Sequence, residues 1–348
     1  MKVNIKTLAT KYKWIFRAFI LLSAIFIYFV ILFFVPNFFP AEGNKSYLKI
    51  PDNSTYEDVI NKLETESGVI SLFTFKQAAY LIHFGEKIRP GRYEIHAGMS
   101  NFSLLRKLRS GRQTPLNLTF NNLRTKNDLA GSLSQQIMAD SVDILQHLND
   151  TAFLGKYDLT PETAVCLFIP NTYEVFWDMN TEELFERMNK EYNSFWTDER
   201  KAAAAAIPLT LTEVSTLASI VEEESNANAE RPTIAGLYLN RLKKGMPLQA
   251  DPTVKFAVGD FSLKRINSTH TAVKSPYNTY QNTGLPPGPI RIASAAGIKA
   301  VLNFQKHDYI FMCAKETFDG THNFAATWEE HTRNARKYQQ ALDARNIH

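Results

Sequence analysis

The longest apolar stretch of the chain lies near its N-terminus, where residues 18–35 read AFILLSAIFIYFVILFFV without a single charge. An α-helix needs about 20 predominantly apolar residues to cross the hydrocarbon core of a bilayer. Apolar residues 14–16 extend the run upstream of Arg17. We therefore predict a transmembrane helix over residues 18–36.

Basic residues precede this stretch: Lys2, Lys6, Lys11, Lys13 and Arg17. Positive charge on one flank keeps that flank in the cytoplasm, so residues 1–17 are predicted to be cytoplasmic. Everything after about residue 40 would then lie outside the cytoplasmic membrane. A cleaved signal peptide is the alternative, but the apolar run is long and PNFFPAEG offers no small-x-small cleavage site. We expect an uncleaved, single-pass anchor in the cell inner membrane.

Beyond a short linker, three segments repeat one pattern of a short strand, a polar turn and an amphipathic helix. Ile50, Ile95 and Phe120 serve as strand anchors. At offsets of 9, 10 and 13 the segments carry, in turn, Val59, Ile60 and Leu63, then Leu104, Leu105 and Leu108, then Leu129, Ala130 and Leu133. One helical face after a fixed turn produces this spacing. We predict a small α+β module over 45–112 and a connecting α+β region over 113–205.

The C-terminal part mixes helices with polar loops. Helical patterns cover residues 182–196 and 199–206, and a further helix is predicted from about Thr212 to Ser225. RPTIAGLYLNRLKKG follows, with Pro232 suited to a first helical turn and Gly245 to a C-terminal cap. After the loop SPYNTYQNTGLPPGPI come a short helix, a strand (YIFMCA) and a basic helix. Residues 206–348 are predicted to form a mixed α+β domain, which makes the whole chain α+β.

Composition narrows the function classes. The 39 basic and 35 acidic residues leave a net charge of +4, with no basic stripe of the kind that binds nucleic acid. The two cysteines, Cys166 and Cys313, lie far apart and show no metal-type spacing. Two buried free thiols are the simpler interpretation, and a disulfide is the alternative. We expect no metal and no cofactor.

Three consecutive glutamates end the predicted helix in LASIVEEESN, residues 217–226. At about 100° per residue, the buried stripe of that helix is Val214, Leu217, Ala218 and Val221. Glu223 lies opposite the stripe, so we expect it in solvent. Glu222 lies at the flank of the stripe.

Glu224 extends the apolar face instead, because it follows Leu217, Ile220 and Val221 by seven, four and three residues. A carboxyl group there either pairs with a cation or lies in a poorly solvated cleft with a raised pKa. A raised pKa is what a general acid needs near neutral pH. The plainer interpretations remain open: a frayed helix end, or a pairing with Arg231 or Arg241.

Four sequence blocks occur in the order found in one family: LASIVEEES, LYLNRLKKGMPLQADPTV, SPYNTYQNTGLPPGPI and THNFAAT. In these blocks the chain resembles the endolytic murein transglycosylases of the YceG-like family. The resemblance spans nearly the whole length and includes the N-terminal anchor, a LysM-like module over 45–112 and a C-terminal catalytic core. The family's catalytic glutamate, the second acidic residue of V-E-K-E-[TS], corresponds to Glu224. The middle lysine of that pattern is Glu223 here.

The resemblance implies a reaction. Lytic transglycosylases cut the β-1,4 bond between N-acetylmuramic acid and N-acetylglucosamine, using the C6 hydroxyl of the muramic acid as nucleophile and leaving a 1,6-anhydro end. One carboxyl group can serve both proton transfers, whereas ordinary glycosidases need two. By resemblance the substrate is nascent peptidoglycan, whose polymerisation the cut would terminate, and peptidoglycan synthases are expected partners.

Supporting residues are hypotheses of the same resemblance and of loop chemistry. Tyr277 and Tyr280 are expected to stack on sugar faces, and Asn278 and Gln249 to hydrogen-bond N-acetyl or hydroxyl groups. Asp251 is expected to bind substrate or to orient the site, and His322 and Asn323 to line the cleft. For each of them a structural role is the alternative. Asp251, for example, precedes Pro252, and an aspartate before proline is a natural turn residue.

Two other functions compete with the transglycosylase. One is a non-catalytic scaffold that holds glycan strands at the membrane through the small modules. The other is a hydrolytic muramidase with Asp251 or Glu222 as its second carboxylate.

Overall fold

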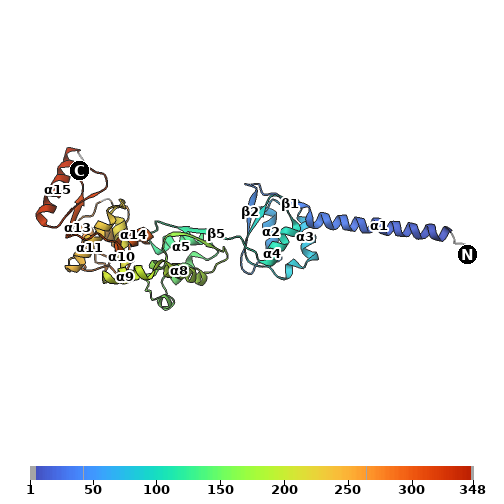
Figure 1. Ribbon diagram of the computed structural model, residues 1–348, viewed down its shortest axis with the longest axis horizontal. Helices are drawn as coiled ribbons and strands as arrows, with labels where there is room; N and C mark the ends of the chain where they lie inside the picture. Colours follow the sequence, from blue (N-terminus) through green and yellow to red (C-terminus); the bar gives the residue numbers. More distant parts are fainter. Residues whose placement is uncertain (1–4, 42, 264, 346–348) are drawn as a thin grey trace. The chain divides into compact units, whose positions relative to one another are not determined.

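The computed structural model describes residues 5–41, 43–263 and 265–345 (Figure 1). The first four residues of the predicted cytoplasmic segment, Lys2 among them, and the last three of the predicted C-terminal domain lie outside the described residues. Helix α1 runs from Ile5 to Phe34. Within it, the 23-residue stretch Tyr12–Phe34 contains a window with a mean hydropathy of 2.6, and only 6% of that window is buried. This helix is long and apolar enough to be a single-pass membrane anchor.

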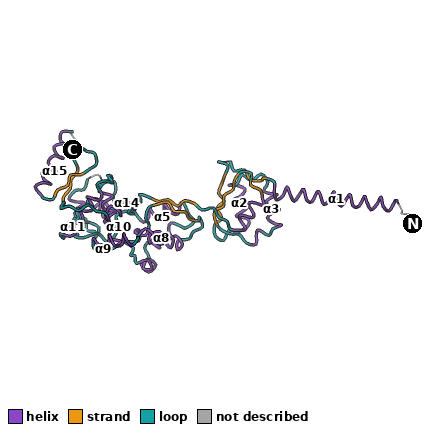
Figure 2. Tube along the Cα trace, viewed as in Figure 1, coloured by secondary structure: helices purple, strands orange, loops and turns teal. Residues whose placement is uncertain are grey.

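The chain forms two compact units. The first comprises Met1–Asn117 with Glu174–Met179, and the second comprises Leu118–Tyr173 with Asn180–His348. Helices dominate both, and in the described part of the chain the strands pair into two-stranded sheets (Figure 2). The predicted mixed α+β class is confirmed. The division does not separate residues 113–205 from 206–348, so that predicted boundary stays a prediction.

In the first unit, β2 (Lys45–Ile50) pairs antiparallel with β3 (Gly91–His96), and two helices lie between them in sequence. The other elements are β1 (Pro36–Phe38), α2 (Tyr56–Glu66), α3 (Leu72–Leu81), the 3₁₀ helix Phe84–Glu86, β4 (Met99–Ser100) and α4 (Asn101–Ser110). The predicted apolar positions of α2 and α4 are all buried in one core. The predicted linker after the span is not loose, because β1 pairs with β4.

The second unit begins in β5 (Leu116–Phe120), which pairs with β6 (Asn171–Val175). Helices then follow: α5 (Lys126–Ser134), α6 (Ser141–His147), α7 (Thr151–Leu154), α8 (Thr181–Phe195), α9 (Asp198–Ala206), α10 (Leu211–Glu224), α11 (Arg231–Lys243), α12 (Asp251–Val258), α13 (Ser268–Thr271) and α14 (Ala295–Leu302). The chain finishes with β7 (Phe311–Ala314), β8 (His322–Ala325) and α15 (Trp328–Ala344). On α5 the predicted face is buried, so the three-fold strand–helix pattern is confirmed.

Helix α10 is the central element of the second unit. Thr210 and Glu213 begin it with a reciprocal capping box. Every residue from Val214 to Glu222 is buried, and α9, α11, α12 and α14 pack around it. The predicted bounds differ from the observed ones by one residue at each end.

The stretch 166–177 contains the end of a 3₁₀ helix (Ala164–Leu167) and strand β6. Both cysteines are free thiols. Cys166 is buried, as expected, but Cys313 is only half-buried.

Candidate active site

Glu222 holds α10 against α14 through hydrogen bonds. Its Oε2 accepts a hydrogen bond from the Ser294 N–H at 2.9 Å, and its Oε1 accepts from the Ser294 hydroxyl and, at 3.3 Å, from Arg231 Nη1. Ser294 caps the N-terminus of α14, where a negative charge is favourable. A Cβ at Gly297 would lie 2.5 Å from Glu222 Cδ, so only glycine permits this approach. The side chain is 4% exposed, and its role is structural.

Glu223 is clamped by two arginines, Arg124 Nη2 at 2.7 Å and Arg291 Nη1 at 2.7 Å. Its side chain is only 14% exposed, so the prediction that it would be solvated is wrong. Other segments of the chain pack closely on the polar side of α10, because the side chains on that side are short. Ser219, for example, donates to the Thr216 carbonyl and accepts a hydrogen bond from the Ile290 N–H at 3.0 Å.

Glu224 has no such partner. It is the last residue of α10, and its Oε2 is buried without a hydrogen-bond partner in the described part of the chain. Arg231 is turned to Glu222, and Arg241 donates to backbone carbonyls and to Gln249. Neither of the two arginines considered as neutralising partners is therefore paired with it.

The environment of Glu224 favours its protonated form. Burial first, and then the charge of Asp251, raise its pKa from the usual 4.5 to about 7; the neighbouring Tyr238 hydroxyl and Lys255 act in the opposite direction. The C-terminal end of a helix carries partial negative charge, which disfavours a carboxylate there as well. At neutral pH a large fraction of Glu224 therefore holds a proton.

Tyr238, on α11, is a buried polar neighbour of Glu224. It is 1% exposed, and its hydroxyl donates to no other group in the described chain, so it is free to donate to the Glu224 carboxyl group. Burial, followed by the charge of Glu224, raises its pKa well above the usual value. Tyr238 therefore stays a neutral donor that faces an acid.

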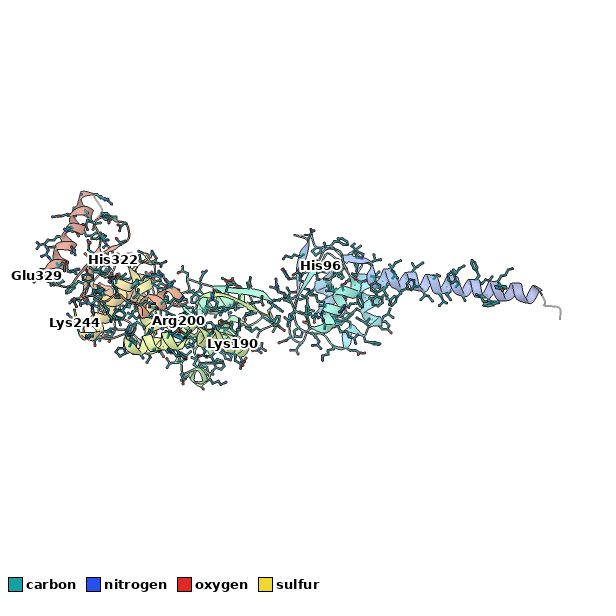
Figure 3. The ribbon with its side chains drawn as sticks, viewed as in Figure 1. His96, Lys190, Arg200, Lys244, His322 and Glu329 are labelled. Atoms are coloured by element: carbon teal, nitrogen blue, oxygen red, sulfur yellow. The ribbon has the colours of Figure 1, made fainter. Side chains whose placement is uncertain are left out.

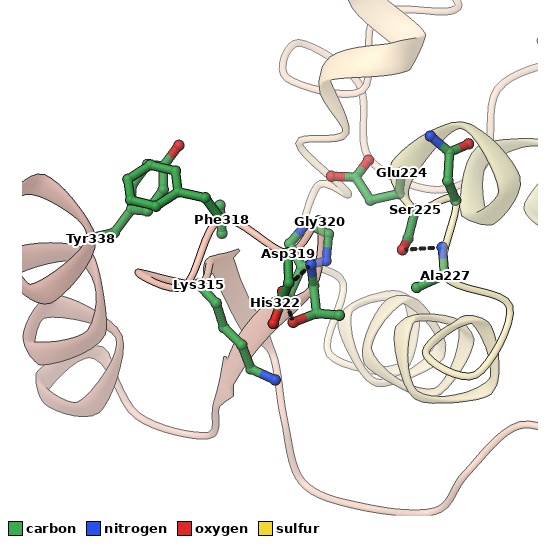
Figure 4. Close-up of a pocket in the computed structure, with 12 residues that line it drawn as sticks. Glu224, Ser225, Ala227, Lys315, Phe318, Asp319, Gly320, His322 and Tyr338 are labelled. Carbon is green, nitrogen blue, oxygen red and sulfur yellow. Dashed lines mark hydrogen bonds between the residues drawn. The ribbon is translucent and has the colours of Figure 1, made fainter. Parts of the chain in front are cut away.

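One cavity of about 560 Å³ opens on the carboxyl group of Glu224 (Figure 4). Its lining comes from the loop after α10 and from the β7–β8 hairpin: Ser225, Asn226, Ala227, Ala314, Lys315, Phe318, Asp319, Gly320, Thr321 and His322, with Tyr338 of α15. Figure 4 shows Glu224 and His322 on different elements around this space. His322 is held by Glu230, which accepts from its N–H at 2.9 Å and lies 3.1 Å from Nδ1.

A second cavity, of about 300 Å³, also has Glu224 in its lining. Tyr280 donates a hydrogen bond to Asp251 at 2.6 Å in its wall, and Gln249 accepts one from Arg241 at 2.6 Å. Gln249 has φ +54°, a left-handed conformation that a non-glycine residue adopts at a cost. The remaining wall consists of Leu237, Tyr238, Leu248, Phe311, Met312, Trp328 and His331.

Glu224 is thus the described residue that the two cavities have in common. Ligand sites in proteins have volumes of roughly 300–1,000 Å³. An extended ligand that occupied both cavities would have the Glu224 carboxyl group near its middle.

Besides Glu224, four of the predicted site residues line these cavities: Gln249, Asp251, Tyr280 and His322. Figure 3 labels His322, the first residue of β8, and Glu329, in the first turn of α15. The shared property of the four is a side chain that reaches the cavity wall from a loop or an element end.

Three predicted site residues lie elsewhere. Tyr277 packs on Phe256 with ring centroids 4.7 Å apart and lines a different cavity. Asn278 is fully buried; its amide donates to the Thr271 and Val273 carbonyls and accepts the Tyr280 N–H. Asn323 donates to Glu316 at 2.8 Å and lines neither cavity of Glu224.

Sequence reasoning missed Tyr238, Trp328 and His331. Trp328 and His331 face one another across 5.3 Å between ring centroids, and Trp328 is 63% exposed on the first turn of α15. Burial, followed by the charge of Arg241, lowers the pKa of His331 below its usual 6.5. The available signal was the segment TWEEH, which places a tryptophan directly after the helix cap Thr327.

Residues 5–41, 43–263 and 265–345 contain no group of three or more histidine, cysteine, aspartate or glutamate side chains placed to hold a metal ion. The described lining of the site supplies a proton donor, neighbouring hydroxyls and an aromatic wall.

Comparison with known proteins decides the family. The YceG-like family model matches residues 48–337. The chain belongs to the YceG-like family. The resemblance seen in the sequence blocks is confirmed, and this family membership covers both units.

Named relatives of this YceG-like chain agree. It is 29% identical over 309 residues to the endolytic murein transglycosylase of Bacillus subtilis strain 168, covering 84% of each chain. It is 26% identical to the endolytic murein transglycosylase of Streptococcus pneumoniae D39, covering 89% of this chain and 62% of the pneumococcal one. The crystal structure of a yceG-like protein from Listeria monocytogenes matches with a TM-score of 0.55 and 27% identity, over 83% of this chain and 98% of that one.

Proposed function

We propose that the protein is a membrane-anchored endolytic murein transglycosylase with Glu224 as its catalytic acid and base. The observation that carries the proposal is the carboxyl group itself, which has a pKa raised to about 7, no ion-pair partner among the described residues, and a place in the lining of two cavities. Relatives over most of the chain bear the name endolytic murein transglycosylase. Two cavities that share the acid suit cleavage inside a glycan strand and not only at its end.

The proposed step follows from one carboxyl group. Protonated Glu224 gives its proton to the glycosidic oxygen between N-acetylmuramic acid and N-acetylglucosamine, and the C1–O bond breaks. The C6 hydroxyl of the muramic acid attacks C1 and passes its proton to the Glu224 carboxylate, which closes the 1,6-anhydro ring and restores the acid. A pKa near the working pH suits a group that must both give and take a proton. Holding the C6 hydroxyl close replaces an encounter with water.

Asp251 gives a second candidate some support, because it lines the same cavity as Glu224. In a hydrolytic muramidase this carboxylate would act as nucleophile or activate a water. Its Oδ1, however, accepts a hydrogen bond from Tyr280, which suits a group that orients a neighbour. The end group of the product separates the two reactions, since hydrolysis leaves a reducing end and transglycosylation leaves an anhydro end.

Supporting roles follow from the cavity walls. Tyr280 and Trp328 offer ring faces for sugar stacking, and Gln249 and His322 offer hydrogen bonds to N-acetyl or hydroxyl groups. Asn278 has no free donor left, so we assign it the positioning of the loop that carries Tyr280. The roles proposed from the sequence for Tyr277 and Asn323 stay predictions without support from the two cavities.

The cellular setting is part of the proposal. Helix α1 would cross the cell inner membrane once, with its N-terminus in the cytoplasm and both units on the outer side. Residues 45–112 would act as a LysM-like glycan-binding module; their strand–helix–helix–strand order supports this. Cleavage of nascent strands would then terminate polymerisation beside the peptidoglycan synthases. Protease added outside spheroplasts should digest both units, and protection of the units would reverse the orientation.

The decisive experiment is product analysis with purified full-length protein and isolated peptidoglycan. We expect anhydro-ended fragments from the wild type and none from Glu224→Gln. Glu223→Gln is the matched control, because it changes the adjacent residue, which lines neither cavity of Glu224. Full activity of Glu224→Gln would remove the proposal, reducing ends would favour the muramidase, and no cleavage by the wild type would favour a scaffold.

A further inference from the structure

The junction between α1 and the first unit is built as a rigid connection. Leu32 and Phe33, in the last turn of α1, are buried in the core of that unit at 1% and 4% exposure. Figure 1 shows α1 entering the unit beside α3 without a break. The apolar span therefore ends inside a folded core.

Two buried asparagines lock this junction. Asn101 donates to the Leu32 carbonyl at 2.8 Å, and Asn37 donates to Asn101 Oδ1 at 2.7 Å. Asn37 also exchanges hydrogen bonds with Ser71, the N-cap of α3, at 2.8 and 3.0 Å. Because the amide groups are buried and paired, α1, α3 and α4 form one body.

Large apolar side chains near this junction are exposed. Phe39, Ile70, Phe73 and Phe102 are 47%, 68%, 66% and 40% exposed. Backbone hydrogen bonds fix two of them beside the end of the span: Phe39 N–H to the Gly68 carbonyl at 2.9 Å, and Ile70 N–H to the Asn37 carbonyl at 2.8 Å. We call these four residues the collar.

The collar adjoins the membrane span at Phe102, which contacts Phe34, the last residue of α1, with ring centroids 5.2 Å apart. Phe73 lies on the first turn of α3, two residues after the Ser71 cap that Asn37 holds. Lys76, one turn further along α3, is also exposed, and a lysine there can reach lipid headgroups while its stem stays on apolar surface.

We propose that the collar is buried in the interfacial zone of the bilayer, so that the first unit is seated in the membrane surface. The proposal rests on the membrane anchoring proposed above for α1. Contiguous exposed apolar surface is costly in water, and burial at the headgroup boundary stabilises it. Because the junction is rigid, insertion of α1 would carry the collar to this depth.

The test places a fluorescent reporter at single positions of the full-length chain in vesicles. Cys166→Ala and Cys313→Ala remove the native thiols, and NBD is attached at Phe73→Cys in the collar. Phe26→Cys in the span and Asp52→Cys, beyond the far end of β2, are the matched controls. The vesicles are phosphatidylcholine with a nitroxide near the glycerol end of one acyl chain.

We expect emission at position 73 to be blue-shifted and quenched to an extent similar to position 26, with no quenching at position 52. If position 73 behaves like position 52 while position 26 is quenched, the anchor stands and the collar proposal is wrong. If position 26 is also unquenched, anchor and collar fail together. Emission at position 73 could be blue-shifted without quenching by the nitroxide lipid, with a shift that disappears when the protein is diluted into excess vesicles. In that case the collar contacts a second copy of the chain, and the proposal is wrong. Ile70→Cys repeats the test at the most exposed collar residue.

Discussion

The Tyr280 hydroxyl donates a hydrogen bond to Asp251 Oδ1 at 2.6 Å, in the wall of the cavity that Glu224 shares. The charge of Asp251 is the second cause, after burial, of the raised pKa of Glu224. The pair thus keeps a negative charge near an acid that must hold its proton. Three of the predictions below follow from how neighbouring groups set that pKa or respond to it.

Asp251→Asn should move the pH profile of cleavage. The asparagine keeps the shape and can still accept from Tyr280, but it removes the charge that raises the pKa of Glu224. Because the protonated acid starts the reaction, the loss of kcat/KM at alkaline pH should begin at a lower pH than in the wild type. Initial rates at limiting substrate from pH 5 to pH 9 measure this; Asp260→Asn, which changes an aspartate bonded to Ser262, is the control. An unchanged alkaline limb would contradict the electrostatic role.

Tyr238→Phe should move the same limb the other way. The Tyr238 hydroxyl lowers the pKa of Glu224, and phenylalanine removes it with little change in packing. The alkaline loss of kcat/KM should therefore begin at a higher pH than in the wild type. The same pH series reports it, and a shift in the direction of Asp251→Asn would mean that the hydroxyl acts in some other way.

Glu224→Gln should stabilise the second unit while it abolishes cleavage. An acid whose folded pKa is raised contributes most stability below its unfolded pKa, and this contribution is lost as pH rises from 4.5 to about 7. The wild type then carries a deficit on the order of 3 kcal/mol above pH 7, which glutamine removes. The gain in the free energy of unfolding should be large at pH 8 and small at pH 5.

Urea unfolding of the full-length protein, followed by tryptophan fluorescence, measures this gain; Trp196 is the buried tryptophan of the second unit. Glu222→Gln is the informative comparison. It leaves Arg231 without its partner in a buried network, so it should lower stability by about 3 kcal/mol. Equal effects of the two substitutions would show that the three glutamates do not differ in the way described.

The sequence predicted local features of this fold well. Val59, Leu104 and Leu129 are buried at the offset assigned to them, because the distance from a strand to the first inward position of the next helix depends on one short turn. The end of α10 was predicted to within one residue for a similar reason. The spacing of apolar residues and the identity of the capping residues depend only on positions that are close in the sequence.

Contacts between distant residues could not be predicted in this way. Glu223 is paired with Arg124, 99 residues before it, and with Arg291, 68 residues after it. The local pattern showed a polar helical side but not the chain that covers it. Asn278 illustrates the same limit at the site: its amide is used up inside its own loop, and a polar loop sequence cannot distinguish such a residue from one that contacts a ligand.

Trp328→Ala should weaken substrate binding more than chemistry. The ring is 63% exposed and lines the cavity of Glu224 beside Phe311 and His331, so its removal takes away a stacking surface and leaves no hole in the core. Loss of one aromatic contact of about 1–1.5 kcal/mol corresponds to a rise in KM of roughly 5- to 12-fold. We expect kcat to stay within about twofold of the wild type. Trp328→Phe keeps a ring and should restore most of the affinity, whereas a loss confined to kcat would assign Trp328 to the reacting centre instead.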